Sequence, residues 1–174
     1  KLSLKKNKIG ILGGSFDPAH KGHLSISKEA TKRFKLKKVI WAITKKNPFK
    51  RKSSLSLSTR IEYCKKIIKK TKFIEVKFFE KRIKSNKTIN LINFFTKNKR
   101  NEVYFIMGAD NLINFHKWHK WKLISKKCNI VVFDRYGYKK KSLNSKSYKS
   151  LNKQKLKFID FNKVNISSSQ LRKI

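Results

Sequence analysis

Two histidines three residues apart form a pair that could act on a phosphate. They lie in the segment GGSFDPAHKGH, residues 13–23, which follows an apolar run and precedes a helical pattern. A helix N-terminus carries unpaired N–H groups and a partial positive charge, both of which favour a phosphate. His20 and His23 could donate hydrogen bonds to phosphoryl oxygens as negative charge develops there. Gly14 and Gly22 leave room for a nucleotide close to the backbone, although the segment is neither a GxGxxG motif nor a P-loop.

A second polar cluster, ISSSQLR at residues 166–172, could hold further phosphate oxygens. Three serine hydroxyls stand at the start of an expected helix, and Arg172 follows one turn later. Hydroxyls and unpaired N–H groups can surround a phosphate, and arginine adds charge-assisted hydrogen bonds. A serine-rich start followed by arginine is common in helices, so this pattern alone indicates only a cap.

These segments need a scaffold, and the chain alternates short apolar runs with helical patterns. The runs predict strands over 8–16, 39–44, 73–79, 103–107, 130–133 and 156–161, and helices over 22–34, 59–70, 88–95, 110–127 and 167–174. Thr59 with Glu62 is a candidate capping box, and Ser85 or Asn86 could cap the third helix. The basic run 138–155 has no periodicity and predicts a mobile loop.

Alternating strands and helices indicate an α/β fold with a mainly parallel sheet of about five to six strands. Ligands of such folds bind outside the carboxyl ends of the strands. The residues after Leu12, Thr44, Met107 and Phe133 therefore carry the functional expectation. Asp110, in the Gly-Ala-Asp segment that follows Met107, is a candidate helix cap as well as a candidate ligand group.

The charge admits a rival class of function. The 174 residues hold 47 Lys+Arg against 9 Asp+Glu, for a net charge of +38. A basic nucleic-acid-binding protein would have such a charge and would bind with a steep salt dependence. The lysines are spread along the whole chain, however, and the sequence is poor in Ala, Gly and Pro, so we interpret most of the excess as compositional drift. The length suits one domain over 1–174.

Neither a membrane nor an oxidising compartment is indicated. No apolar run approaches the roughly 20 residues that a membrane span needs, and no apolar signal core follows the basic start. Cys64 and Cys128 are too few for a disulfide framework and are interpreted as reduced core thiols. We therefore expect a cytoplasmic protein.

The motifs resemble those of a known family. GSFDPAHKGH resembles the signature of the nucleotidylyltransferase superfamily, whose HxGH motif binds the triphosphate of ATP or CTP. GADNLINFHKW, residues 108–118, is similar to the GADxLxxFxxW stretch of the nicotinate-nucleotide adenylyltransferase family, and NPFK and ISSSQLR also match. The resemblance implies a Rossmann-like, doubly wound fold and an enzyme that joins nicotinate mononucleotide to ATP, giving deamido-NAD and pyrophosphate. The alternative within the superfamily is pantetheine-phosphate adenylyltransferase, which shares the HxGH and ISSS parts but not the tryptophan stretch.

The resemblance also implies roles for individual residues. His20 and His23 would be catalytic. The ATP site would comprise Gly14, Ser15, Phe16, His20, Gly22, His23, Lys50, Gly108, Asp110, Ser167, Ser168, Ser169 and Arg172. The nicotinate nucleotide would contact Asn86, Lys87, Thr88, Trp118 and Arg135, with the Trp118 ring against the pyridine. Because a helix N-terminus favours a carboxylate over a neutral amide, nicotinate should be preferred to nicotinamide.

We predict no metal site made by the protein itself. Four-histidine zinc sites are unusual, so His116 and His119 are interpreted as non-ligands. Mg²⁺ would arrive with ATP, bound to phosphate oxygens and water. The expected partners are ATP and nicotinate mononucleotide, without a specific nucleic acid or a membrane.

Overall fold

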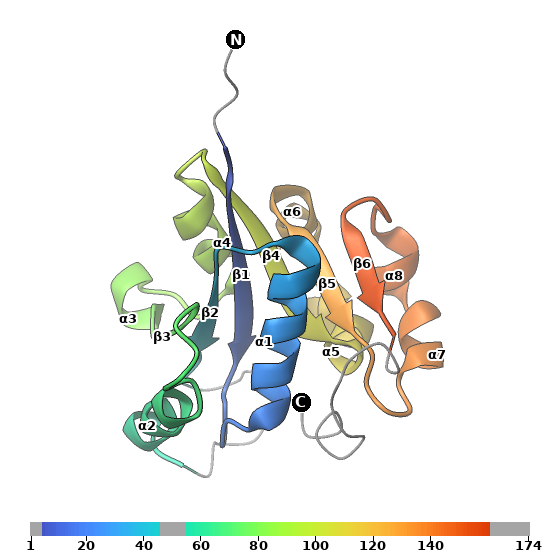
Figure 1. The fold of residues 1–174 in the computed structure, drawn as a ribbon. Helices are drawn as coiled ribbons and strands as arrows, with labels where there is room; N and C mark the ends of the chain where they lie inside the picture. Colours follow the sequence, from blue (N-terminus) through green and yellow to red (C-terminus); the bar gives the residue numbers. More distant parts are fainter. Residues whose placement is uncertain (1–4, 46–54, 161–174) are drawn as a thin grey trace.

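Six short apolar segments form one parallel sheet (Figure 1). The computed structural model describes residues 5–45 and 55–160, and every structural statement below concerns these residues. The strands are β1 (Asn7–Gly14), β2 (Lys38–Ile43), β3 (Ile74–Lys77), β4 (Asn101–Gly108), β5 (Asn129–Phe133) and β6 (Leu156–Ile159). Their order is β3-β2-β1-β4-β5-β6, and all neighbours are parallel. The predicted Rossmann-like, doubly wound fold is confirmed.

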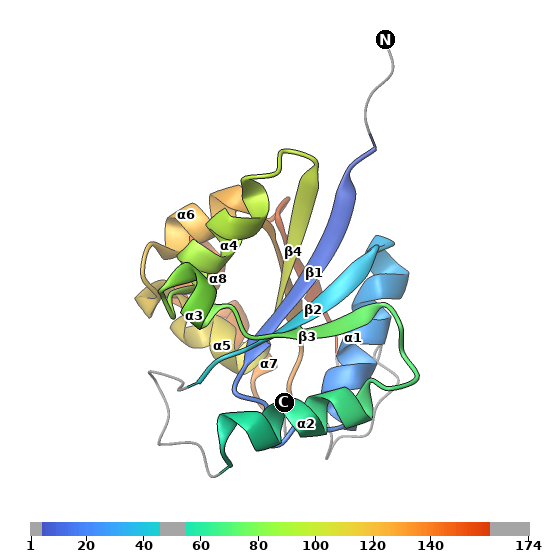
Figure 2. The ribbon, with the colours of Figure 1, turned by 90° about the vertical axis from the view of Figure 1, so that its left-hand side faces the viewer.

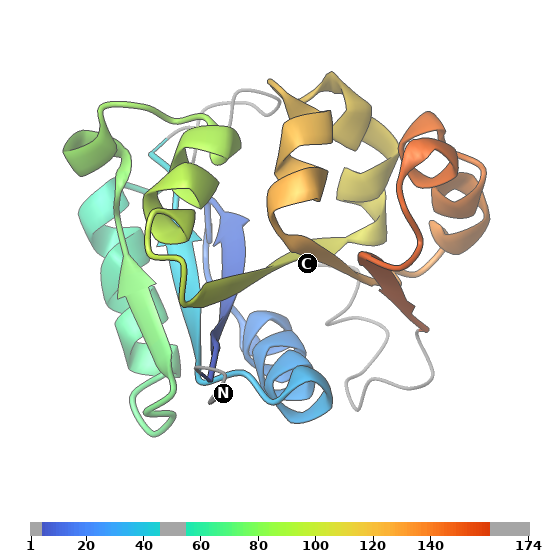
Figure 3. The same cartoon turned by 90° about the horizontal axis from the view of Figure 1, so that it is seen from above.

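Helices cover both faces of this sheet (Figures 2 and 3). One face packs against α1 (Lys21–Phe34) and α2 (Leu57–Ile67). The other packs against α4 (Thr88–Thr96), α5 (Ala109–Asn114) and α6 (Trp121–Lys127). The remaining helices are α3 (Glu80–Ile83), α7 (Lys139–Leu143) and α8 (Lys146–Ser150), and a 3₁₀ turn, η1, spans Phe115–Lys117.

Strand β4 illustrates why the apolar runs are continuous. Phe105 and Met107 belong to the core under α4, α5 and α6, whereas Tyr104 and Ile106 belong to the core under α1 and α2. A strand that is buried on both faces has no polar side, so it lacks the alternation of a half-exposed strand. The same burial fixes the register that brings the carboxyl ends of β1, β2 and β4 to one edge.

The predicted caps of two helices were wrong. Helix α2 begins at Leu57, and its cap is Ser56, whose Oγ accepts the Thr59 N–H at 3.3 Å. The earlier hydroxyl therefore takes the position assigned to Thr59. Helix α4 has Lys87 at its cap position, without a side-chain cap; Ser85 instead accepts the Lys87 N–H from outside the helix, at 3.0 Å.

The predicted continuous helix over 110–127 is broken. Its apolar residues recur at every third position, and this spacing drifts around a helix of 3.6 residues per turn. The chain interrupts the helix so that residues on both sides reach the core: Trp118 has an extended backbone, Lys120 has a φ of 52°, and both Phe115 and Ile124 are fully buried.

The basic run 138–155 was predicted to be a loop, but it contains α7 and α8. Serine hydroxyls hold this segment together with apolar contacts that follow no helical period: Leu151 is in the core, and Tyr138 and Tyr148 pack against it. Ser145 caps α8 by accepting the Tyr148 N–H at 3.1 Å, and buried Ser147 accepts the His116 N–H at 2.9 Å. The predicted helix over 167–174 lies outside the described residues.

Both cysteines are free and buried, and burial raises the pKa of each thiol to about 12. Because the thiolate is the reactive form, we expect Cys64 and Cys128 to react with a disulfide reagent such as dithionitrobenzoate far more slowly in the native protein than in denaturant. Released thionitrobenzoate measures the rate. Rapid reaction of either thiol in the native protein would contradict its placement in the core.

No helix in 5–45 or 55–160 has the length and apolar character that a membrane crossing requires.

Candidate active site

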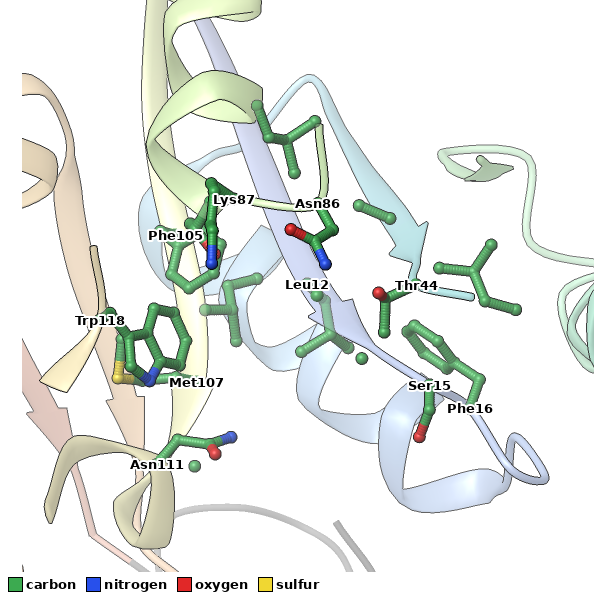
Figure 4. A pocket seen from close by; sticks show the side chains of 18 of the residues that line it. Leu12, Ser15, Phe16, Thr44, Asn86, Lys87, Phe105, Met107, Asn111 and Trp118 are labelled. Atoms are coloured by element: carbon green, nitrogen blue, oxygen red, sulfur yellow. The ribbon is translucent and has the colours of Figure 1, made fainter. Parts of the chain in front are cut away.

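A cavity of about 1110 Å³ opens at the carboxyl edge of the sheet, where the sequence places its functional residues (Figure 4). Its walls come from the ends of β1, β2 and β4, from the segment between α3 and α4, and from the stretch after η1. Sites for drug-sized ligands usually occupy 300–1,000 Å³. This cavity is therefore large enough for two nucleotides side by side.

The two histidines form the cap of α1. His20 Nδ1 accepts the Gly22 N–H, and His23 Nδ1 accepts the His20 N–H, each at 3.1 Å, which makes a capping box from two imidazoles. The ring centroids lie 4.0 Å apart. A neutral imidazole whose Nδ1 accepts a hydrogen bond carries its proton on Nε2. The cap thus makes Nε2 the donor atom of both rings, and His23 lines the cavity.

An aromatic cluster supports His23. Phe16 is buried and lies 4.7 Å, centroid to centroid, from the His23 ring, and it stacks on Trp41 at 5.1 Å. The Trp41 ring also lies 5.8 Å from that of His23. Trp41 is fully buried and donates from Nε1 to Ser27 Oγ at 2.8 Å. Phe16 has a φ of 49°, in the left-handed region that costs a non-glycine residue about 1 kcal/mol or more. The contacts of the Phe16 ring with His23 and Trp41 sustain that conformation.

Asp110 and Arg135 form an ion pair where the chain leaves β4 and β5. Arg135 Nη1 donates to Asp110 Oδ2 at 2.5 Å. Asp110 Oδ1 is buried and has no hydrogen-bond partner among the described residues. A Cβ on Gly108 would lie 2.7 Å from that oxygen, so glycine is required for this position of the carboxylate. A buried acceptor at a cavity wall suits a ligand hydroxyl.

An apolar wall and the start of α4 close the far end of the cavity. The indole of Trp118 meets Phe105 edge-on at 6.0 Å, and Figure 4 shows Lys87 projecting into the cavity from above Phe105. Helix α4 has no side-chain cap in the described chain. Its N-terminus, together with the Lys87 ammonium, makes this end of the cavity positive.

The structure brings most of the predicted residues together. Those that line the cavity are Gly14, Ser15, Phe16, His23, Asn86, Lys87, Thr88, Gly108, Asp110 and Trp118. His20, Gly22 and Arg135 are not among the residues that line it. The His20 ring is in tilted contact with that of His23, and Gly22 is buried at the start of α1. Arg135 is paired with Asp110, although the two were assigned to different substrates. The other predicted positions, Lys50, Ser167, Ser168, Ser169 and Arg172, lie outside the described residues, and their roles stay predictions.

Two charged residues of this edge, Glu80 and Arg60, were not anticipated. Glu80 accepts from Thr44 Oγ1 at 2.5 Å and from the Lys45 N–H at 3.0 Å, which ties α3 to the end of β2. Arg60 lies behind the same strand ends. Thr44 was predicted to end the second strand, and in the structure it directly follows β2. Glu80 lies in no motif that would have indicated its position. Arg60 lies in a helix rich in basic residues, and the sequence does not distinguish a buried arginine from an exposed one there.

The fold and this site define a nucleotidyltransferase, and comparison with known proteins agrees. The model of the cytidylyltransferase-like family matches residues 11–174. In structure, the chain is similar to the Plasmodium falciparum nicotinic acid mononucleotide adenylyltransferase complexed with NaAD. That match has a TM-score of 0.75 and 21% identity, and covers 96% of this chain and 83% of the other.

Sequence relatives specify the class further. A probable nicotinate-nucleotide adenylyltransferase of Pelagibacter ubique is 66% identical over 173 residues, covering 99% of this chain and 96% of the relative. One from Agrobacterium fabrum is 40% identical over 131 residues, covering 74% and 70%. The chain belongs to the nicotinate-nucleotide adenylyltransferase family.

Proposed function

We propose that the chain transfers the adenylyl group of ATP to the 5′-phosphate of nicotinate mononucleotide, with His20 and His23 at the reacting phosphorus. The imidazole cap carries this assignment, because it fixes two Nε2 donors at a helix N-terminus beside a cavity large enough for both substrates. The products are deamido-NAD and pyrophosphate. Residues 1–174 would form one domain, and the free buried thiols support a cytoplasmic location.

The chemistry requires positioning rather than a general base. An oxygen of the nucleotide 5′-phosphate, already anionic, forms a bond to the α-phosphorus of ATP. The bond from that phosphorus to the bridging oxygen breaks, and pyrophosphate leaves with the electron pair. Negative charge spreads over the α-phosphate oxygens on the way. His20 and His23 Nε2 donors stabilise it without reorganising, because their rings are held by the cap and by Phe16.

The cavity walls orient the two nucleotides. Asp110 Oδ1 would accept a ribose hydroxyl of ATP, held in place by Arg135. The pyridine ring would lie against Trp118, where an aromatic face provides contact area at little entropic cost. Its carboxylate would face the start of α4. Lys50, Ser167–Ser169 and Arg172 are proposed for the triphosphate on the resemblance alone.

Mg²⁺ fits this site as an ion carried by ATP. The described chain offers no group of three His, Cys, Asp or Glu side chains able to hold a metal. That His116 and His119 are non-ligands stays a prediction. The carboxylate of Asp110 is engaged by Arg135, and that of Glu80 by Thr44. Bound to phosphate oxygens and water, the ion would neutralise charge on the triphosphate.

Pyrophosphate release tests the proposed function. ATP is combined with nicotinate mononucleotide, nicotinamide mononucleotide or 4′-phosphopantetheine, and the rates are compared. Release with the nicotinate nucleotide in preference to both others supports the proposal. Preference for phosphopantetheine would indicate the alternative transferase. Tight, salt-sensitive binding of nucleic acid without pyrophosphate release would indicate the nucleic-acid-binding class, whereas weak binding at low salt follows from the charge of +38 alone.

Selection of nicotinate should depend partly on Lys87. We expect Lys87→Met to lower the ratio of kcat/KM for nicotinate mononucleotide to that for the nicotinamide form about two- to fivefold, the range for one partly solvated ion pair. The reason is that the ammonium projects into the cavity beside the start of α4. Competition between the two acceptors measures the ratio.

Lys84→Met is the matched control, since Lys84 lies three residues earlier, is exposed and does not line the cavity. It should leave the ratio unchanged. Equal use of the two acceptors by the unmodified enzyme would refute the carboxylate argument itself.

A further inference from the structure

Arg60 is a charged residue in the interior of the protein. It lies in α2 and is only 2% exposed. Taking a guanidinium out of water is costly unless its N–H groups are hydrogen-bonded. In the described chain no carboxylate forms an ion pair with it, and its partners are four backbone carbonyl oxygens. An arginine kept at such a position needs an explanation beyond core packing.

The four carbonyls belong to the three chain segments that meet behind the cavity. Arg60 Nη1 donates to the carbonyl oxygens of Ser15 and Thr44, each at 2.8 Å. Nη2 donates to Lys45 O at 2.8 Å, and Nε to Leu55 O at 3.1 Å. Ser15 is in the turn after β1, Thr44 and Lys45 follow β2, and Leu55 precedes α2. One guanidinium thus joins the carboxyl ends of the two strands to the start of a helix.

The bond to Ser15 leads directly to the histidines. The Ser15 carbonyl is part of the peptide that joins Ser15 to Phe16, so fixing it restrains the φ of Phe16. That φ is 49°, a conformation that packing must sustain. The Phe16 ring in turn lies 4.7 Å from the His23 ring. Arg60 therefore restrains, through one peptide and one aromatic contact, the imidazole assigned to the α-phosphate.

We propose that Arg60 is a positioning residue for adenylyl transfer, which holds the Ser15–Phe16 turn against the end of β2 so that His23 meets the α-phosphate. The inference rests on the proposed function. Lysine cannot replace it, because one ammonium cannot reach four carbonyls arranged around a planar fork. A misplacement of about 1 Å in the site can cost about 10²-fold in rate.

Steady-state kinetics of Arg60→Lys test the proposal, with Cys64→Ala as the matched control. Cys64 is buried one turn further along α2 and contacts none of the strand ends through a hydrogen bond in the described chain. We expect Arg60→Lys to lower kcat about 10- to 100-fold and to raise KM for ATP, with KM for the nicotinate nucleotide within about twofold. Cys64→Ala should lower the thermal midpoint and leave all three constants unchanged.

A double variant tests the route through Phe16. If Arg60 acts through the Phe16 turn, Arg60→Lys combined with Phe16→Leu should lower kcat little more than the worse single variant, because coupled residues are non-additive. Multiplying effects would overturn the proposal. The proposal would also be overturned if Arg60→Lys, like Cys64→Ala, left the kinetic constants unchanged. The same holds if the Arg60→Lys variant raised both KM values equally or failed to fold. Failure of the proposed function is distinguishable, since the unmodified protein would then release no pyrophosphate.

Discussion

His23→Ala is expected to lower kcat about 10²–10³-fold, the range for loss of one preorganised donor to a developing anion. The alanine variant removes two things at once. It removes the Nε2 donor proposed for the reacting phosphate, and it removes Nδ1, which accepts the His20 N–H in the α1 cap. Initial rates of pyrophosphate release at saturating ATP and nicotinate mononucleotide measure the first effect, and thermal unfolding measures the second.

His23→Asn separates the two roles. The Asn oxygen can occupy the place of Nδ1 and preserve the cap, but the side chain is too short to supply a donor at Nε2. We expect it to keep most of the thermal midpoint that alanine loses and still to lose about as much kcat. If His23→Asn turned over at the native rate, His23 would be a helix cap and nothing more.

Trp118→Ala is expected to raise KM for nicotinate mononucleotide about 5- to 100-fold, since stacking of a heterocycle on an aromatic side chain is worth about 1–3 kcal/mol. Trp118 lines the cavity, and Phe105 and Phe115 hold its ring edge-on. KM for ATP should change little, because the adenosine is proposed to bind against other residues of the cavity, among them Asp110. Titrating each substrate at saturating levels of the other measures the two constants.

Trp121→Ala is the control for this prediction. Trp121 packs on Phe115 at 5.8 Å but does not line the cavity, so its loss should reduce stability and leave both KM values unchanged. If Trp118→Ala changed KM for ATP alone, the assignment of the indole to the nicotinate nucleotide would be wrong.

The sheet was predictable from the sequence because its strands are buried on both faces. Continuous apolar runs such as 103–107 have few alternative structures when helical patterns separate them. The local breaks were not predictable in this way. The three-residue spacing through Phe115, Trp118 and Trp121 imitates a helix. The contact that Ser147 of α8 makes depends on η1, which is distant in sequence.

The site was predictable where residue type and spacing both carried information. His20 and His23 are marked by a glycine turn between a strand and a helix. The pairing of Arg135 with Asp110 was not predictable, because it joins the ends of β5 and β4 through a register that only the folded sheet defines. The role of Arg60 was not predictable either, because its four partners are backbone carbonyls. Every residue has a backbone carbonyl, so no residue type in the sequence indicates these partners.

The strand order has a consequence for the synthesis of the protein. One edge of β1 pairs with β4, whose residues lie roughly ninety positions later in the chain. During translation that edge keeps unpaired N–H and C=O groups until β4 has also left the ribosome. The segment that carries both histidines, residues 13–23, thus emerges long before the strand that completes its support, and the nascent chain must avoid aggregation for that whole interval.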